Sequence, residues 1–135
     1  MNLIFRKIED ILKFLGQKPT VSDDRALYEA NRDKALKLIK SRVEYFNKFY
    51  NFKVGQIRVK NHRSIWGSCS RRGNLNFNYK LLFLPDHLIN YVIVHEICHL
   101  KEFNHGKNFW ALVAKFIPDH KAWRDELHKH QFRYF

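Results

Sequence analysis

Apolar residues recur along the chain at two different spacings, which separate helical from extended parts. Between about residues 22 and 50 they lie three or four apart, with lysines and arginines between them: Leu36, Ile39, Val43, Phe46 and Tyr50. This spacing predicts a long helix with a buried stripe and a basic outer face. A similar pattern at 4–15 predicts a shorter first helix. The Gly, Pro and Ser residues of 16–24 predict a linker that ends in a helix N-cap at Ser22 or Asp23.

The middle of the chain alternates apolar and polar residues, as β-strands do. Strands are predicted within 53–60, 64–70 and 73–84, and "RRG" at 71–73 is expected to join the last two as a turn. In the last strand, leucine and aromatic residues alternate with asparagines, so one face should be buried and the other polar. We therefore expect a small, mostly antiparallel sheet.

Helical spacing returns after this sheet. Pro85 suits the first turn of a helix, and helices are predicted over 85–103 and 106–117 and again after Pro118. Strands followed by helices predict an α+β fold. Since 135 residues suffice for one hydrophobic core and are too few for two, we expect a single domain over 1–135.

Composition narrows the class of protein further. The chain is 45% hydrophobic and 16% aromatic, which argues for a folded domain. Its two cysteines, Cys69 and Cys98, are too few for a disulfide framework and suggest a reducing compartment. The N-terminus lacks the apolar run of a signal peptide, and no stretch approaches the roughly 20 apolar residues of a membrane span. A cytoplasmic protein without a membrane partner is expected.

The chain is strongly basic. Its formal net charge of +12 and pI of about 9.9 favour contact with phosphates, so nucleic acid or a nucleotide is a candidate partner for the basic surface. The basic residues are spread along the sequence, however, which an ordinary solvated surface explains equally well. Charge alone does not select a function.

The segment "VHEICHLKEFNH", residues 94–105, concentrates histidine and glutamate within one predicted helix and its end. His95 and His99 are four residues apart, so both imidazoles project from one helical face and can bind one ion. Glu96 lies one step around the helix, where it can reach a water on that ion. A helix whose histidines only form hydrogen bonds in the core is the alternative interpretation.

A catalytic zinc usually has three protein ligands, so a third is needed. His105 is the nearest candidate, provided that the chain turns sharply after about residue 103. Asn104 tolerates the left-handed backbone that such a turn was expected to use. Glu126 and Asp119 are rival carboxylate ligands further along the chain.

Three blocks, in order, resemble the YgjP-like metallopeptidase domain, a relative of the SprT-like and other zincin folds. They are "SIWGSCSRRGNLNFN" (64–78), "YVIVHEICHLKEFNHGKNFW" (91–110) and "PDHKAWRDEL" (118–127), and the resemblance spans 31–127. It implies a zincin-like domain whose sheet packs on an active-site helix, with 1–20 as N-terminal helix and linker and 22–135 as catalytic core. It also implies that His95, His99 and His105 bind zinc and that Glu96 is the general base. Ile65 departs from the family, which usually has a basic residue there.

The expected function is a zinc-dependent hydrolase, foremost a metallopeptidase in which a zinc-bound water, activated by Glu96, attacks a peptide carbonyl. A peptide or protein is then the expected substrate, and the strand at 73–78 is expected to offer it an edge. A phosphohydrolase acting on nucleotides would use the same metal and base. A nucleic-acid-associated module with a structural zinc and a basic helix at 25–48 is a third hypothesis, although it has no use for Glu96. Five residues are candidates for the second donor to the oxyanion: His62, Arg71, Tyr79, His87 and His120.

Overall fold

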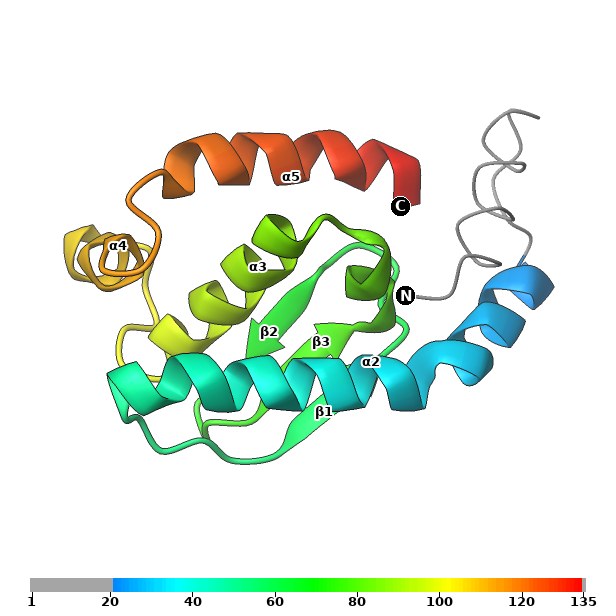
Figure 1. Ribbon diagram of the computed structural model, residues 1–135, viewed down its shortest axis with the longest axis horizontal. Coiled ribbons are helices and arrows are strands. Elements are labelled where there is room, and N and C mark those ends of the chain that lie inside the picture. Colours follow the sequence, from blue (N-terminus) through cyan, green and yellow to red (C-terminus); the bar gives the residue numbers. More distant parts are fainter. Residues whose placement is uncertain (1–20, 135) are drawn as a thin grey trace.

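The computed structural model describes residues 21–134. Its elements, in chain order, are α2 (Val21–Tyr50), β1 (Ile57–Lys60), β2 (Gly67–Cys69), β3 (Leu75–Asn78), the 3-10 helix η1 (Tyr79–Phe83), α3 (Asp86–His99), α4 (Lys107–Ala114) and α5 (His120–Tyr134) (Figure 1). The α+β class is thereby confirmed. The helix predicted at 4–15 and the linker up to residue 20 lie outside the described residues. Among the helices from α2 to α5, none is both long and apolar enough to cross a bilayer.

Helix α2 has the buried stripe that its sequence predicts. The buried positions along it are Ala35, Ile39, Val43, Phe46 and Tyr50, so Ala35 takes the place expected for Leu36. The helix begins at Val21, just before the predicted cap, and is followed by Asn51 with a φ of 56°, a left-handed residue of the kind that ends helices. Its last residue, Tyr50, donates a hydrogen bond to the carbonyl oxygen of Leu112 at 2.7 Å. Helix α2 therefore holds α4 in place.

The sheet has the strand order β1-β3-β2, with β3 in the centre. Strands β2 and β3 form the predicted antiparallel hairpin, and Gly73, with a φ of 84°, lies in its turn. Strand β1 pairs with β3 in parallel, so the sheet is mixed and only the hairpin is antiparallel. The loop after β1 reverses the chain, so β2 runs opposite to β1 on the other side of the sheet. The hairpin reverses the chain again, so β3 returns between them, parallel to β1. Asn78 anchors the loop after β1 by donating to the carbonyl oxygens of His62 and Ile65, at 2.9 and 3.0 Å.

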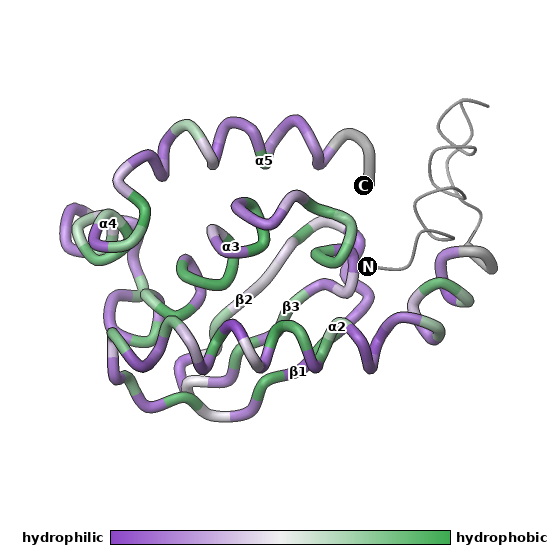
Figure 2. Tube along the Cα trace, in the orientation of Figure 1, coloured by the Kyte–Doolittle hydropathy of each residue, from purple (hydrophilic) through white to green (hydrophobic). Residues whose placement is uncertain are grey.

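One face of the sheet packs on α3, the central helix of the molecule. Leu75 and Phe77 of β3 are fully buried beneath it. Helix α3 is buried on almost all sides because β2, α2, α4 and α5 all contact it. Helix α5 lies across α3 on the side away from the sheet (Figure 1). Figure 2 shows α5 mostly in purple, in keeping with a polar helix that is buried along one side only.

Candidate metal centre and active site

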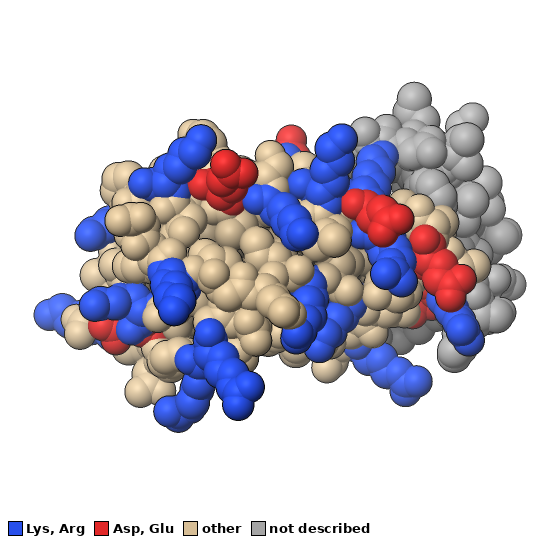
Figure 3. All heavy atoms as spheres, turned by 90° about the horizontal axis from the view of Figure 1, so that it is seen from below, with Lys and Arg blue, Asp and Glu red and all other residues tan. Residues whose placement is uncertain are grey.

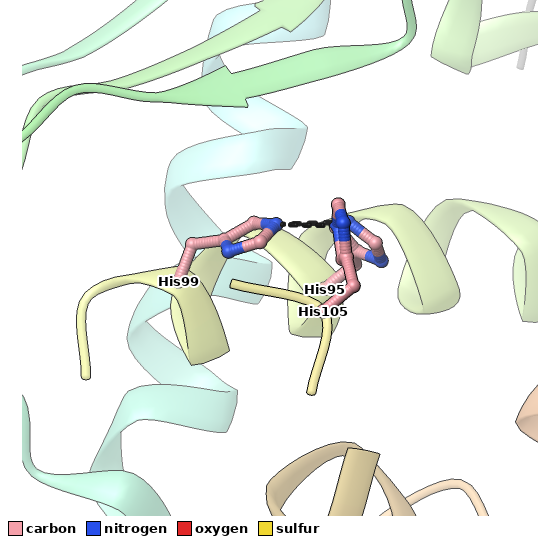
Figure 4. Close-up of side chains that lie close together, drawn as sticks. All are labelled: His95, His99 and His105. Atoms are coloured by element: carbon pink, nitrogen blue, oxygen red, sulfur yellow. Dashed lines mark hydrogen bonds between the residues drawn. The ribbon is translucent and has the colours of Figure 1, made fainter. Parts of the chain in front are cut away.

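Helix α3 and the loop that follows it bring three histidines together. His95 and His99 lie one turn apart on α3, and their Nε2 atoms are 3.1 Å apart. The Nε2 atom of His105, from the loop before α4, is 2.9 Å from that of His99 and 3.1 Å from that of His95. Figure 4 shows the three rings pointing toward one another. We call this cluster the His triad; it contains the three ligands predicted from the sequence.

The His triad fits a zinc ion. Two nitrogens bound to tetrahedral zinc at its usual bond length lie about 3.3 Å apart, close to the separations here. The Nδ1 atom of His99 is 3.0 Å from the carbonyl oxygen of Glu102, which can only accept, so the proton is on Nδ1 and Nε2 carries a lone pair. Burial, followed by the charges of His99 and His105, lowers the pKa of His95 to about 3, so this ring is neutral as well. Converging lone pairs of this kind are stabilised by a cation.

The turn that returns His105 to α3 is tighter than the sequence suggests. Helix α3 ends at His99 instead of residue 103, and the carbonyl oxygen of Cys98 accepts from the backbone N–H groups of both Lys101 and Glu102. Among the described non-glycine residues, only Asn51 has a positive φ. The expected left-handed backbone at Asn104 is therefore wrong.

Helix α4 supplies the floor and one wall of the His triad. Phe109 is fully buried, and its ring centroid lies 4.9, 4.4 and 5.0 Å from the rings of His95, His99 and His105. Trp110 lies 6.0 Å from both His95 and His105. The sequence predicts a helix here but does not show that these two rings contact the histidines. The spacing of four residues between His105 and Phe109 was the available signal.

Glu96 points toward the sheet, one step around α3 from His95. It is 5% exposed, and burial raises the pKa of its carboxyl group to about 8. The space that it occupies exists because Gly67 of β2 has no side chain: a Cβ there would lie 3.0 Å from both Cγ and Oε2 of Glu96. A buried carboxyl group with such a pKa can accept a proton near neutral pH.

The two cysteines are free thiols beside this region. Cys98 is fully buried. Burial, and then the charge of Glu96, raises the pKa of Cys69 to about 11, and burial raises that of Cys98 to about 11. Both thiols are therefore protonated at neutral pH. Neither belongs to the potential metal-binding group found among the described residues, which consists of the three histidines.

The rival ligands lie elsewhere. The Oε2 atom of Glu126 is 2.8 Å from Nε2 of His87, so this carboxylate ties α5 to the start of α3. Asp119 is exposed in the turn before α5. Neither joins the His triad.

Of the five residues considered as oxyanion donors, three are engaged by partners outside the His triad. Tyr79 donates to Asp24 at 2.6 Å, His87 pairs with Glu126, and the guanidinium carbon of Arg71 lies 5.8 Å from the Phe103 ring. His62 belongs to the loop that Asn78 anchors. His120 stacks on Trp110 with the ring centroids 4.9 Å apart and is thus one ring removed from the His triad.

Arg124 is not among these five candidates, yet it contacts Trp110 as His120 does. It lies one turn after His120 on α5, with its guanidinium carbon 5.4 Å from the Trp110 ring. Burial raises the pKa of Tyr91, one turn before His95 on α3, to about 12, and the positive charge of Arg124 opposes that rise. The same charge contributes to the lowered pKa of His95, after burial and the other two histidines. Arg124 is therefore a cation close to the His triad.

The arrangement of strands also corrects which strand offers an edge. Strand β3 was expected to do so, but it is hydrogen-bonded on both sides. The edge strand that packs against α3 is β2.

Solved structures that share this fold include two metallopeptidase zymogens. The crystal structure of the metallopeptidase zymogen of Pyrococcus abyssi abylysin matches with a TM-score of 0.62 and 21% identity, over 67% of this chain and 92% of that chain. The zymogen of Methanocaldococcus jannaschii jannalysin gives 0.58 and 24% identity, over 69% and 94%. Wss1 from Saccharomyces cerevisiae gives 0.52 and 22%, over 68% and 78%. These likenesses establish the fold.

No curated protein matches the chain in sequence. The model of the YgjP-like metallopeptidase domain matches residues 5–130, and the chain belongs to this family. Membership implies a hydrolase with a divalent metal, typically zinc.

Proposed function

We propose that the protein is a zinc-dependent peptidase. The observation that carries this proposal is the convergence of three Nε2 atoms, 2.9 to 3.1 Å apart, beside the buried carboxyl group of Glu96. Membership of a metallopeptidase family supports the same conclusion.

In this proposal His95, His99 and His105 hold the zinc ion. Zinc supplies a Lewis acid that polarises a peptide carbonyl and makes water more acidic. Glu96 accepts the proton of the attacking water and delivers it to the leaving nitrogen. The Glu102 carbonyl fixes the orientation of the His99 ring, and Phe109 packs against all three rings.

We propose that the substrate binds as an extended peptide along β2. This strand has a free edge and packs against α3, so main-chain hydrogen bonds to it would lay the peptide beside the helix that carries Glu96. Strand β2 is only three residues long, from Gly67 to Cys69. A short stretch of substrate is thus fixed by backbone pairing.

The proposed donor to the developing oxyanion is Arg124. Its charge lies on the α5 side of the His triad, and Trp110 supports its guanidinium group. A cation positioned where negative charge develops stabilises the transition state more than the bound substrate. Arg124 should accordingly affect kcat more than KM.

Two assays of the zinc-loaded protein test the peptidase. We expect the wild type to cleave a casein-type substrate and to release no phosphate from nucleoside triphosphates. Glu96→Gln should lose about 100-fold or more of the cleavage because the proton acceptor is gone, with zinc content unchanged. Arg124→Gln should reduce kcat at unchanged zinc content. Phosphate release that depends on Glu96, without cleavage of casein, would overturn the peptidase in favour of a phosphohydrolase.

A further inference from the structure

The positive charge of the protein is unevenly distributed. All 13 acidic residues lie outside residues 45–85, a stretch that carries eight lysines and arginines: Lys48, Lys53, Arg58, Lys60, Arg63, Arg71, Arg72 and Lys80. Lys80 is buried and lies 3.5 Å from Asp24, whereas the other seven side chains are exposed. We call these seven the exposed cations. This stretch includes the whole sheet and the loops that join its strands.

The exposed cations differ from those of α2 in their ion pairs. Within the part of the chain that the structure describes, none of the seven forms an ion pair. Helix α2 differs, because Arg25, Arg32 and Arg42 each pair with a carboxylate. The basic helix at 25–48 that the sequence suggested is therefore partly neutralised by carboxylates, whereas residues 51–85, which include the sheet, contain no acidic residue. Figure 3, which views the molecule from the side of α2 and β1, shows blue side chains scattered around a tan centre and fewer red ones.

Some of these cations lie on the outer face of the sheet. In the parallel register Arg58 lies beside Asn76, and Ser68 lies opposite Asn76 on the other side. The three side chains therefore share the face directed away from the buried Leu75 and Phe77. The side-chain amide of Asn76 donates to the Ser68 hydroxyl at 3.4 Å, while the side-chain oxygen Oδ1 of Asn76 is buried without a partner among the described residues. This face is therefore polar across all three strands and carries the Arg58 cation on β1.

Other exposed cations meet at one end of the molecule. The N–H of Gly55 donates to the carbonyl oxygen of Gly73 at 2.8 Å, which joins the loop of Lys53 to the β2–β3 turn. Arg71, in that turn, lies over the ring of Phe103. Glu102 precedes Phe103 in the chain, and the backbone carbonyl oxygen of Glu102 accepts a hydrogen bond from Nδ1 of His99. The cationic end therefore adjoins the His triad.

Large exposed apolar side chains accompany the cations. The four among the described residues are Tyr45 (66% exposed), Phe49 (58%), Ile65 (41%) and Phe103 (43%). Three belong to residues 45–85, and the fourth lies beneath Arg71. Cations interspersed with exposed aromatic rings suit single-stranded nucleic acid, whose phosphates pair with the cations while its bases stack on the rings.

We infer that the exposed cations and these apolar side chains form a binding surface for single-stranded nucleic acid. An anionic membrane is a poorer match, because membrane-surface binding typically uses one helix with a continuous apolar face, whereas these residues lie on strands, turns and a helix end. An acidic protein would satisfy the charges but has no particular use for the exposed rings. The inference does not depend on the proposed peptidase.

The test is fluorescence anisotropy with a labelled single-stranded DNA of about 30 nucleotides, titrated at roughly 50 to 200 mM salt. The double variant Arg71→Gln/Arg72→Gln should weaken binding at least about tenfold and reduce the slope of log K against log salt by about 1.4. Its matched control is Lys34→Gln/Lys37→Gln, which removes the same charge from exposed, unpaired positions on α2. The control should change affinity less than about twofold. Phe103→Ala should weaken binding without changing the slope.

Three results would overturn the inference. One is no binding by the wild type at the lowest salt. Another is that Arg71→Gln/Arg72→Gln and the α2 control weaken DNA binding equally, which would mean that net charge alone is responsible. The third is tighter binding of polyglutamate or of phosphatidylserine vesicles than of the oligonucleotide. Circular dichroism of each variant checks that the fold is retained.

Discussion

Gly67 is where the backbone of β2 comes closest to the proposed base. A Cβ at this position would lie 3.0 Å from the Glu96 side chain and 3.2 Å from the carbonyl oxygen of Asn76. The Asn76 carbonyl belongs to the central strand and is fixed by the sheet, so the Glu96 side chain would have to move. A residue without a side chain is thus required for Glu96 to keep its place.

We predict that Gly67→Ala lowers kcat by roughly three- to tenfold, because a Cβ 3.0 Å from the Glu96 side chain would push it by a few tenths of an ångström, and a displacement of about 1 Å costs about 100-fold. Zinc content should not change, since the three atoms nearest to such a Cβ belong to Glu96 and Asn76 and not to a triad histidine. The measurements are kcat on a peptide substrate and zinc per chain by atomic absorption. Gly106→Ala is the control: a Cβ there meets nothing within 4 Å, and its φ of −87° suits alanine. Wild-type kcat in Gly67→Ala would contradict the requirement.

At the scale of elements, Asp24 ties the first turn of α2 to the segment after β3. Its carboxylate accepts hydrogen bonds from the Tyr79 hydroxyl at 2.6 Å and from Asn61 at 3.0 Å, and Lys80 lies 3.5 Å away. Burial acts to raise the pKa of Asp24, but the bonds from Tyr79 and Asn61 and the charge of Lys80 together lower it below its ordinary value. The ionised form therefore stabilises the folded state.

Asp24→Asn should reduce the free energy of unfolding at pH 7 by about 1.5 to 3 kcal/mol, the usual contribution of hydrogen bonds to a charged group. Because the pKa of Asp24 is lower in the folded state, its charge stabilises the fold fully at pH values above the pKa of the unfolded state, about 3.9. This stabilisation is lost as the pH falls through the pKa of the folded state. The difference between wild type and variant should thus shrink on acidification. Urea unfolding of both proteins from pH 7 down to pH 3 (about the unfolded carboxyl pKa) measures it. A constant difference would rule out a role for the Asp24 charge.

Elements defined by local spacing were predictable from the sequence. Helix α2, the β2–β3 hairpin and the helical span of His95 and His99 follow from periodicity alone. The parallel pairing of β1 with β3 was not, because it joins segments separated by the hairpin and depends on the loop that Asn78 holds. The early end of α3 depends on which N–H groups the Cys98 carbonyl binds, and residue type does not specify this.

At the scale of the whole molecule, the proposed zinc ion would link the end of α3 to the start of α4 and so stabilise the fold. Ligand at about 100 times its Kd adds about 2.7 kcal/mol to the free energy of unfolding. We expect this gain in the wild type. We also expect it in Glu126→Ala, because the Glu126 carboxylate of the native protein pairs with His87 and not with the His triad. His105→Ala should lose it, together with most of the zinc.

The readouts are zinc per chain after dialysis and urea unfolding with and without zinc. Equal zinc in the wild type and in His105→Ala would remove this histidine from the ligand set. Loss of zinc in Glu126→Ala would restore the carboxylate as a candidate ligand.

The His triad was predictable because its members lie within eleven consecutive residues, from His95 to His105. Arg124 and the cationic surface were not, since α5 reaches the histidines only through Trp110 and the acid-free stretch becomes a surface only when the sheet forms. Hydrophobic spacing shows which side chains are buried. It does not show which distant element they meet.

During biosynthesis, the ability to bind metal can therefore arise before the ability to catalyse. The three imidazoles come from one short run of sequence, while the pocket around Glu96 is completed by a strand synthesised nearly thirty residues earlier. A chain whose sheet has not yet docked onto α3 still has every group needed to capture a cation. A full complement of metal in a purified sample therefore does not certify that its molecules are active.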